Sequence, residues 1–229
     1  NFKLIANIKD FSTKMQNAHR EMTKFAKKTE KMGRNLSRNV TAPLAGIATL
    51  SVMACDKQAN AIAQVEAGLA STGNQVGITS EKLQKMASDL QKKSLFGDEE
   101  ILKNATAQLL TFTNITGEQF SKTQQAALDL ATRLDGDLKS ASIQLGKALN
   151  DPIANLSALS RSGIQFSKDQ KETIKKLWEA GRAADAQNLI LKELSKQYGG
   201  SAEAAAKAGA GGIKQLTMSL GDLSEQFGK

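Results

Sequence analysis

The sequence predicts an all-α protein in which a long, heptad-patterned N-terminal helix precedes a multi-helix module of short helices joined by Gly, Asn and Pro turns. Apolar residues recur at alternating spacings of four and three in the first part of the chain, which is the period of one helix face. Ten of the 229 residues are aromatic (eight Phe, one Trp and one Tyr), and so few disfavour a β-sheet. No segment shows the period-two alternation that is typical of a strand.

An apolar seam runs along residues 1–42 and repeats over about five heptads. Its large members are Leu4, Ile8, Phe11, Met15, Met22, Phe25, Met32 and Leu36, and Ala18 and Thr29 occupy the two remaining positions. The flanking residues Lys14, Glu21 and Lys28 have no charged partners on the opposite flank, so the pattern does not specify an oligomer. The seam therefore predicts either self-association or packing against a later helix of the same chain.

Nearly all of the net charge lies in this first segment. Residues 1–42 hold ten basic and three acidic residues, a net +7 of the formal +8 of the chain. Lys and Arg side chains neutralise phosphates, so a basic helix of this kind is also compatible with direct DNA binding. Its aromatic residues Phe11 and Phe25 belong to the seam, however, and are not free to stack on bases. We expect a solvated basic face, with direct DNA binding as the alternative.

A second helix is predicted at residues 43–71. Thr41 is a suitable N-cap and Pro43 suits the first turn of a helix. The first half of the segment is apolar on nearly all sides, which predicts burial between other helices or partner chains. The uncharged stretch at residues 39–55 is shorter than the ~20 predominantly apolar residues that a membrane span needs.

Residues 72–212 are expected to form a folded helical module, because Gly, Asn, Asp and Pro repeatedly interrupt the apolar pattern and let the chain reverse. The predicted helices are 80–93, 98–112, 118–134, 138–149, 153–161, 168–180 and 184–198. Residues 213–229 start a further helical segment, with Ile213, Leu216, Leu220 and Leu223 on one face.

The composition disfavours most catalytic and metal chemistry. The chain has one His and one Cys, whereas a zinc site needs about four ligands and a disulfide needs two thiols. The carboxylates of Asp98, Glu99 and Glu100 come at a predicted helix start, where the helix dipole favours negative charge. Asp135 and Asp137 flank a turn. We expect no catalytic residue, no metal or cofactor site and no small-molecule substrate.

Three blocks of sequence resemble a known family. The first is the string of residues 33–37 followed by 40–44, and the second is residues 95–101 with 109–112 and 127–131. The most specific block contains Leu145, Gly146, Lys147, Ala148, Leu149, Asp151 and Pro152, and it continues through residues 186–191 and 198–202. In these blocks, which together cover most of residues 30–205, the chain is similar to phage tail tape measure proteins, including those encoded by prophages.

The resemblance implies a structural, non-enzymatic virion protein that lies inside the tail tube and sets tail length during assembly. It also implies a later role in DNA delivery, assembly in the bacterial cytoplasm, and contacts with tail tube, tail terminator or assembly chaperone proteins. Family members are much longer than this chain, which is therefore expected to be an N-proximal fragment. The alternatives are a helical DNA-associated or regulatory coiled-coil protein and, from residues 44–55, a membrane-active helical protein.

The mass of the chain in solution distinguishes the two interpretations of the seam. If the seam self-associates, the 229-residue chain is larger than a monomer, and removal of residues 1–40 reduces it to the mass of a monomer. Light scattering coupled to size-exclusion chromatography measures both forms. A monomer in both forms would contradict self-association and favour packing within one chain.

Overall fold

The computed structural model describes residues 17, 20, 47–135, 137–161, 163–209 and 211–228. The contacts within the chain define two compact units, Asn1–Leu50 and Ser51–Lys229. Throughout the described residues the regular structure is helical and contains no strand, which confirms the predicted all-α class. The seam residues Leu4, Ile8, Phe11, Met15, Met22, Phe25, Met32 and Leu36 lie outside the described residues, as do Thr41 and Pro43.

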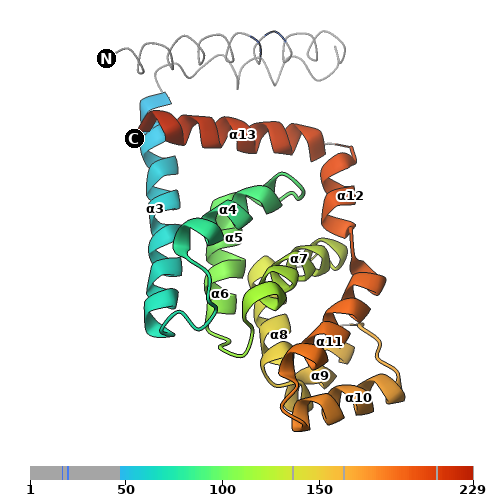
Figure 1. Ribbon diagram of the computed structural model, residues 1–229. Coiled ribbons are helices and arrows are strands. Elements are labelled where there is room, and N and C mark those ends of the chain that lie inside the picture. Colours follow the sequence, from blue (N-terminus) through green and yellow to red (C-terminus); the bar gives the residue numbers. More distant parts are fainter. Residues whose placement is uncertain are drawn as a thin grey trace. The chain divides into compact units, whose positions relative to one another are not determined.

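The helices follow the predicted order (Figure 1). In chain order they are α3 (Ile47–Ser71), α4 (Ser80–Gln91), α5 (Asp98–Ile101), the π-helical turn η1 (Leu102–Thr106), α6 (Ala107–Leu110), α7 (Gly117–Arg133), α8 (Leu138–Asn150), α9 (Pro152–Arg161), α10 (Lys168–Glu179), α11 (Ala183–Tyr198), α12 (Ser201–Lys207) and α13 (Gly211–Gly228). Most of these bounds lie within two residues of the predicted ones. The last helix begins at Gly211 rather than at Ile213.

Side-chain caps define several helix starts. Asp137 precedes α8 and accepts a hydrogen bond from the backbone N–H of Ser140 at 2.8 Å. Ser167 precedes α10 and forms a capping box with Gln170, in which each side chain accepts from the backbone N–H of the other residue. Such caps satisfy N–H groups that have no partner within the helix. Gly200, at φ 78°, provides the left-handed conformation between α11 and α12 that other residues adopt at a cost.

One segment departs from the predicted continuous helix. The turn η1 is wider than an α-helical turn and separates α5 from α6. Buried residues here come in pairs four apart, at Ile101–Leu102, Ala105–Thr106 and Leu109–Leu110. In an α-helix of 3.6 residues per turn, positions four apart drift by about 40° around the axis. A π-helical turn takes up this drift, so all three pairs face the core.

The core of the second unit forms around α7, which contacts α8, α11 and α12. Phe120 and Leu128 on this helix are fully buried. α8 also packs against α9 and α6, and α10 packs against α11, so the chain folds back on itself repeatedly (Figure 1). These short, mutually packed helices position the surfaces described below.

Gly146 in α8 lies directly under the aromatic ring of Phe112. A Cβ atom at this position would overlap the ring, because the two helices α6 and α8 approach closely here. Glycine inside a helix is unfavourable by about 1 kcal/mol relative to alanine. The close contact with Phe112 therefore explains why this helix interior carries glycine.

Replacing Gly146 by valine is expected to lower the free energy of unfolding by about 1–3 kcal/mol, because the added atoms overpack the contact with Phe112. Urea unfolding followed by circular dichroism measures the change. Gly212→Val is the matched control, since a Cβ there meets nothing within 4 Å. Equal stabilities for the two variants would contradict the proposed contact. The double variant Gly146→Val, Phe112→Ala should cost less than the sum of its single changes.

Candidate partner-binding surface

The first segment of the family-like block, residues 145–152, ends at a sharp reversal of the chain. Leu145, Gly146, Ala148 and Leu149 are buried in α8, Lys147 is exposed, Asp151 follows the helix, and Pro152 begins α9. Proline cannot continue α8, because it lacks the N–H group that the next turn requires. The side chain of Asp151 accepts a hydrogen bond from Ala154 N–H at 3.2 Å, which caps the start of α9. Most of the segment is therefore packing: Lys147 is exposed, Asp151 is partly exposed, and Pro152 is buried.

Two side chains from elsewhere satisfy the end of α8. Gln187 on α11 is 1% exposed, and its Nε2 donates to the carbonyl oxygens of Asn114 and Leu149 at 2.8 and 3.1 Å. Asn114 in turn donates from its backbone N–H to Asn150 Oδ1 at 3.1 Å and from its Nδ2 to Asn150 O at 2.9 Å. We call these four residues, Asn114, Leu149, Asn150 and Gln187, the α8 junction. It joins α8, α11 and the loop that follows α6.

Beside this junction lies a groove between α9 and α10, with a volume of about 250 Å³. Its lining residues are Pro152, Ile153, Leu156, Ser157, Lys171, Ile174 and Lys175. Leu156 and Ile174 are 7% and 2% exposed and form an apolar floor, whereas Ile153 is 51% exposed. The α9–α10 groove therefore combines a large exposed aliphatic side chain with two lysines.

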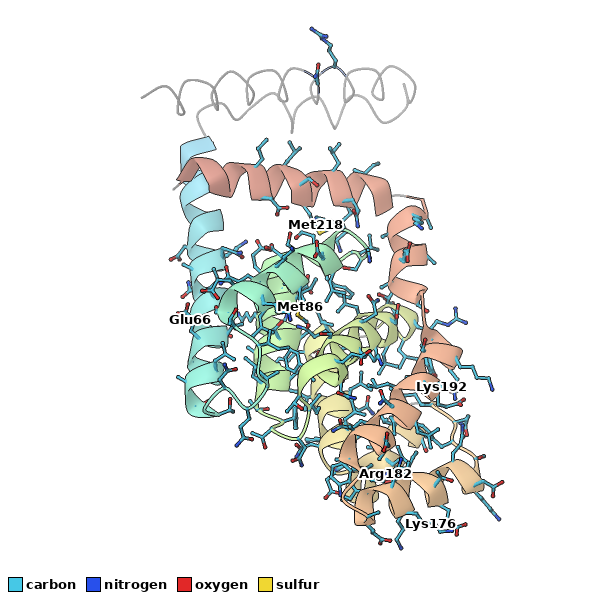
Figure 2. The ribbon with its side chains drawn as sticks, viewed as in Figure 1. Glu66, Met86, Lys176, Arg182, Lys192 and Met218 are labelled. Atoms are coloured by element: carbon cyan, nitrogen blue, oxygen red, sulfur yellow. The ribbon has the colours of Figure 1, made fainter. Side chains whose placement is uncertain are left out.

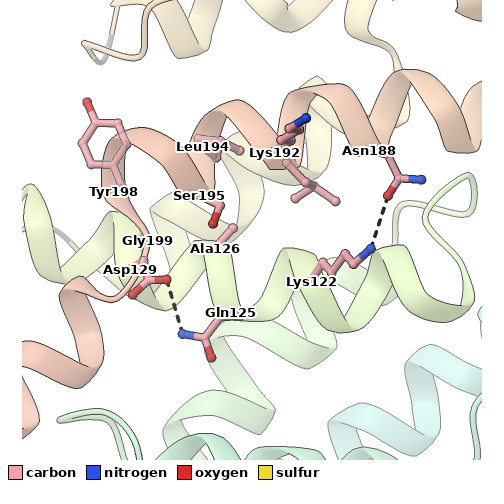
Figure 3. A pocket seen from close by; sticks show the side chains of 11 residues that line it. Lys122, Gln125, Ala126, Asp129, Asn188, Lys192, Leu194, Ser195, Tyr198 and Gly199 are labelled. Atoms are coloured by element: carbon pink, nitrogen blue, oxygen red, sulfur yellow. Dashed lines mark hydrogen bonds between the residues drawn. The ribbon is translucent and has the colours of Figure 1, made fainter.

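A larger groove of about 540 Å³ lies between α7 and α11 (Figure 3). At one end Lys122 donates to Asn188 Oδ1 at 3.5 Å, and at the other Gln125 donates to Asp129 at 3.3 Å. Asp129 is 4% exposed and also accepts from the backbone N–H of Ala202 at 2.9 Å. This carboxylate therefore fixes the start of α12, which makes its role structural.

Carboxylates of α5 and α13 lie close together, and Gln91 bridges them. Gln91 on α4 donates from Nε2 to Asp222 on α13 at 2.5 Å and accepts from the backbone N–H of Asp98 at 2.5 Å. Burial raises the pKa of Glu99, and the neighbouring Asp98 raises it further. Burial and then Asp98 likewise raise the pKa of Asp222. Burial also raises the pKa of Glu100, so desolvation here outweighs the favourable helix dipole that the sequence suggested.

Hydrogen bonds connect α13 to α4 and to the residues that follow it. Besides the bond from Gln91 to Asp222, Gln215 Nε2 donates to Gln91 O at 3.0 Å and to Ser94 O at 2.6 Å. Two apolar residues predicted for this helix, Ile213 and Leu216, are 49% and 42% exposed. Ionisation of the half-buried Glu99 and Asp222 opposes this attachment, because burial disfavours their charged forms.

Within the described residues, no group of three His, Cys, Asp or Glu side chains is arranged to hold a metal ion. None of the described helices is long and apolar enough to cross a membrane.

A sequence model of the family described as prophage tail length tape measure protein matches residues 8–175. The chain belongs to this family. No curated protein and no solved structure matches the chain. Membership identifies a phage tail protein, which associates with other tail components and has its location in the virion tail.

The match includes residues 145–152 of the family-like block, but not its continuation at residues 186–191 and 198–202. It also includes every residue that lines the α9–α10 groove. The α7–α11 groove, in contrast, is lined partly by residues 188–199, which lie beyond the matched segment. Among the candidate surfaces of this tape measure family member, the α9–α10 groove is thus the one formed entirely by family-matched residues.

The sequence patterns predicted neither the buried hydrogen bonds of Gln187 nor the exposure of Ile153. A signal for Gln187 was present, because it shares a helix face with Ile190, Leu191 and Leu194, all of which are buried. A polar residue on such a face requires buried hydrogen-bond partners. No comparable signal exists for Ile153, because its spacing to Leu156 is that of a buried pair.

The carboxylate cluster predicts that α13 of this tape measure family member detaches more readily as pH rises. A carboxyl group whose pKa is raised in the folded state stabilises that state below its ordinary pKa, and the contribution is lost as pH rises through the raised value. Protection factors of α13 amides from hydrogen exchange, corrected for intrinsic rates, should therefore fall as pH rises above the ordinary carboxyl pKa of about 4.

Asp222→Asn should weaken this pH dependence, because asparagine still accepts the hydrogen bond from Gln91 but carries no charge. Glu203→Gln is the control, since Glu203 pairs with Lys207 at 2.6 Å on the exposed surface of α12. Protection of α13 that rises with pH, or that Asp222→Asn leaves unchanged in its pH dependence, would show that the cluster does not oppose attachment.

Proposed function

We propose that this chain is part of the tape measure that sets tail length during assembly, lies inside the tail tube, and later takes part in DNA delivery. The match of residues 8–175 to the prophage tape measure family is the observation that carries the proposal. A helix suits the role of a ruler because it lengthens by about 1.5 Å for each residue added. We propose a structural and non-enzymatic role, consistent with a chain that has one His and one Cys.

The described body and the N-terminal segment suit different parts of this role. Helices α8 to α11 fold back on one another, so their residues do not add length along one axis. A folded body of this kind suits docking to tail tube, tail terminator or assembly chaperone proteins in the bacterial cytoplasm before the tail is complete. The heptads of residues 1–42 suit self-association and extension along an axis.

Direct DNA binding is the second candidate, and the basic residues 1–42 favour it. Residues 43–229 carry a net charge of only +1, so the rest of the chain adds little to that argument. Lys176 and Arg182, both labelled in Figure 2, pair with Glu172 at 2.8 Å and with Asp185 at 2.7 Å, respectively. Cations already paired with carboxylates attract phosphates less strongly. We therefore favour the structural role.

Tail length in virions tests the ruler. The full tape measure gene is altered in the prophage so that residues 8–35, four heptads, are present in one, two or three copies. Each extra copy adds 28 residues and should lengthen the tail by about 40 Å in electron micrographs. A Gly/Ser insertion of equal length between Gly73 and Asn74 is the control, because it extends a surface turn and should not change tail length. Identical tail lengths for all three repeat numbers would refute a ruler that includes this segment.

A further inference from the structure

We propose that the α9–α10 groove is a docking site for an acidic segment of another tail protein, which inserts a large apolar side chain beside Ile153. The proposal rests on the tail function proposed above and names a surface and a partner chemistry for it. The partner is a protein segment in which an aliphatic or aromatic side chain is flanked by Asp or Glu within one helical turn.

The apolar part of the groove is incomplete without a partner. Ile153 lies in the first turn of α9 and leaves 51% of its surface exposed, while Leu156 one turn later is 7% exposed. Ile174, 2% exposed on α10, completes the floor. Large exposed aliphatic side chains next to an apolar concavity are typical of protein interaction sites. An inserted apolar side chain would cover Ile153 and contact the floor.

The charges at the groove select an acidic occupant. Lys171 and Lys175 stand one turn apart on α10 and both line the groove. Lys175 lies 3.8 Å from Glu179, and both of those side chains are more than half exposed. Lys176, outside the groove, is the lysine that pairs closely with Glu172, at 2.8 Å. The groove therefore presents two cations: Lys171, for which no ion pair forms among the described residues, and Lys175, whose ion pair with Glu179 is long and exposed.

The size and lining of the groove disfavour other ligands. At about 250 Å³ it is smaller than the roughly 300–1,000 Å³ of small-molecule sites. Its lining contains no aromatic residue on which a base could stack, and its two lysines offer few phosphate contacts. An aliphatic floor with a cationic rim fits a short amphipathic protein segment better than a nucleic acid.

Photo-crosslinking in the assembling phage identifies the occupant. The full-length tape measure protein is produced from an induced prophage with a photoreactive phenylalanine in place of Ile153. The matched control carries it in place of Ile213, which is 49% exposed on α13. Mass spectrometry then locates the crosslinked segment. A tail-protein segment in which Asp or Glu flanks an apolar residue, captured at position 153 and not at 213, supports the proposal.

Charge reversal tests the chemistry independently. Lys171→Glu with Lys175→Glu should lower the crosslink yield at position 153 at least tenfold, and exchange of the acidic residues of the captured segment for lysine should restore it. Ile153→Glu should lower the number of tailed particles at least tenfold, whereas Ile213→Glu should leave it unchanged. The fluorescence of Trp178 and the circular dichroism spectrum confirm that each variant is folded.

Three results would overturn the proposal. They are crosslinks from position 153 only to the same chain or to DNA, a captured segment without acidic residues, and a crosslink yield that charge reversal does not change. Failure of the ruler is distinguishable from these results. Tails of constant length together with a charge-dependent crosslink would refute the ruler alone, whereas tails that scale with the repeats but give no such crosslink would refute the docking site alone.

Discussion

The hydrogen bonds of Gln187 at the end of α8 are the constraint on which the described fold depends. The last carbonyl groups of a helix have no partner within it, and burying them without one is costly. The Nε2 of Gln187 satisfies Leu149 O and also binds Asn114 O, which brings α11 and the loop after α6 to one point. Because α8 is closed there, Pro152 can start α9 in a new direction, and the α9–α10 groove follows from that reversal.

In the function proposed above, two parts of the chain have different mechanical roles. A ruler needs residues that extend along one axis, and the heptads of residues 1–42 have the appropriate pattern. The body from α7 to α11 instead consists of short helices that reverse at caps and turns, so it forms surfaces rather than length. The proposed function requires both properties, since the proposed ruler would also have to engage other tail components.

Sequence patterns predicted the local structure well because caps, turns and helical periodicity are local properties. Ser167 and Gln170, for example, form a capping box that lies within four consecutive residues at the start of α10. The π-helical turn was also readable in principle, from apolar pairs spaced by four at residues 101–110. A continuous α-helix accounts for the same spacing of apolar residues, so the pattern alone does not distinguish the two.

The candidate site was much less predictable, because it depends on contacts between distant residues. The spacing of Ile153 and Leu156 indicates a buried face, and only the position of α10 decides that Leu156 is covered and Ile153 is not. The attachment of α13 through Gln91 and Gln215 joins residues more than 120 positions apart. Burial of Glu99 and Glu100, which reverses the effect expected from the helix dipole, follows from the same long-range packing.

The stability of a Gln187→Met variant tests the α8 junction most directly. Methionine keeps the size of the side chain but leaves the carbonyl groups of Asn114 and Leu149 without their donor. Urea unfolding should show a loss of about 1–3 kcal/mol, with the same shift in the fluorescence of Trp178 and in circular dichroism. Gln125→Met, which removes one hydrogen bond of 3.3 Å to Asp129, is the control and should cost less. A Gln187→Met variant as stable as the unaltered chain would contradict the junction as the constraint that organises this fold.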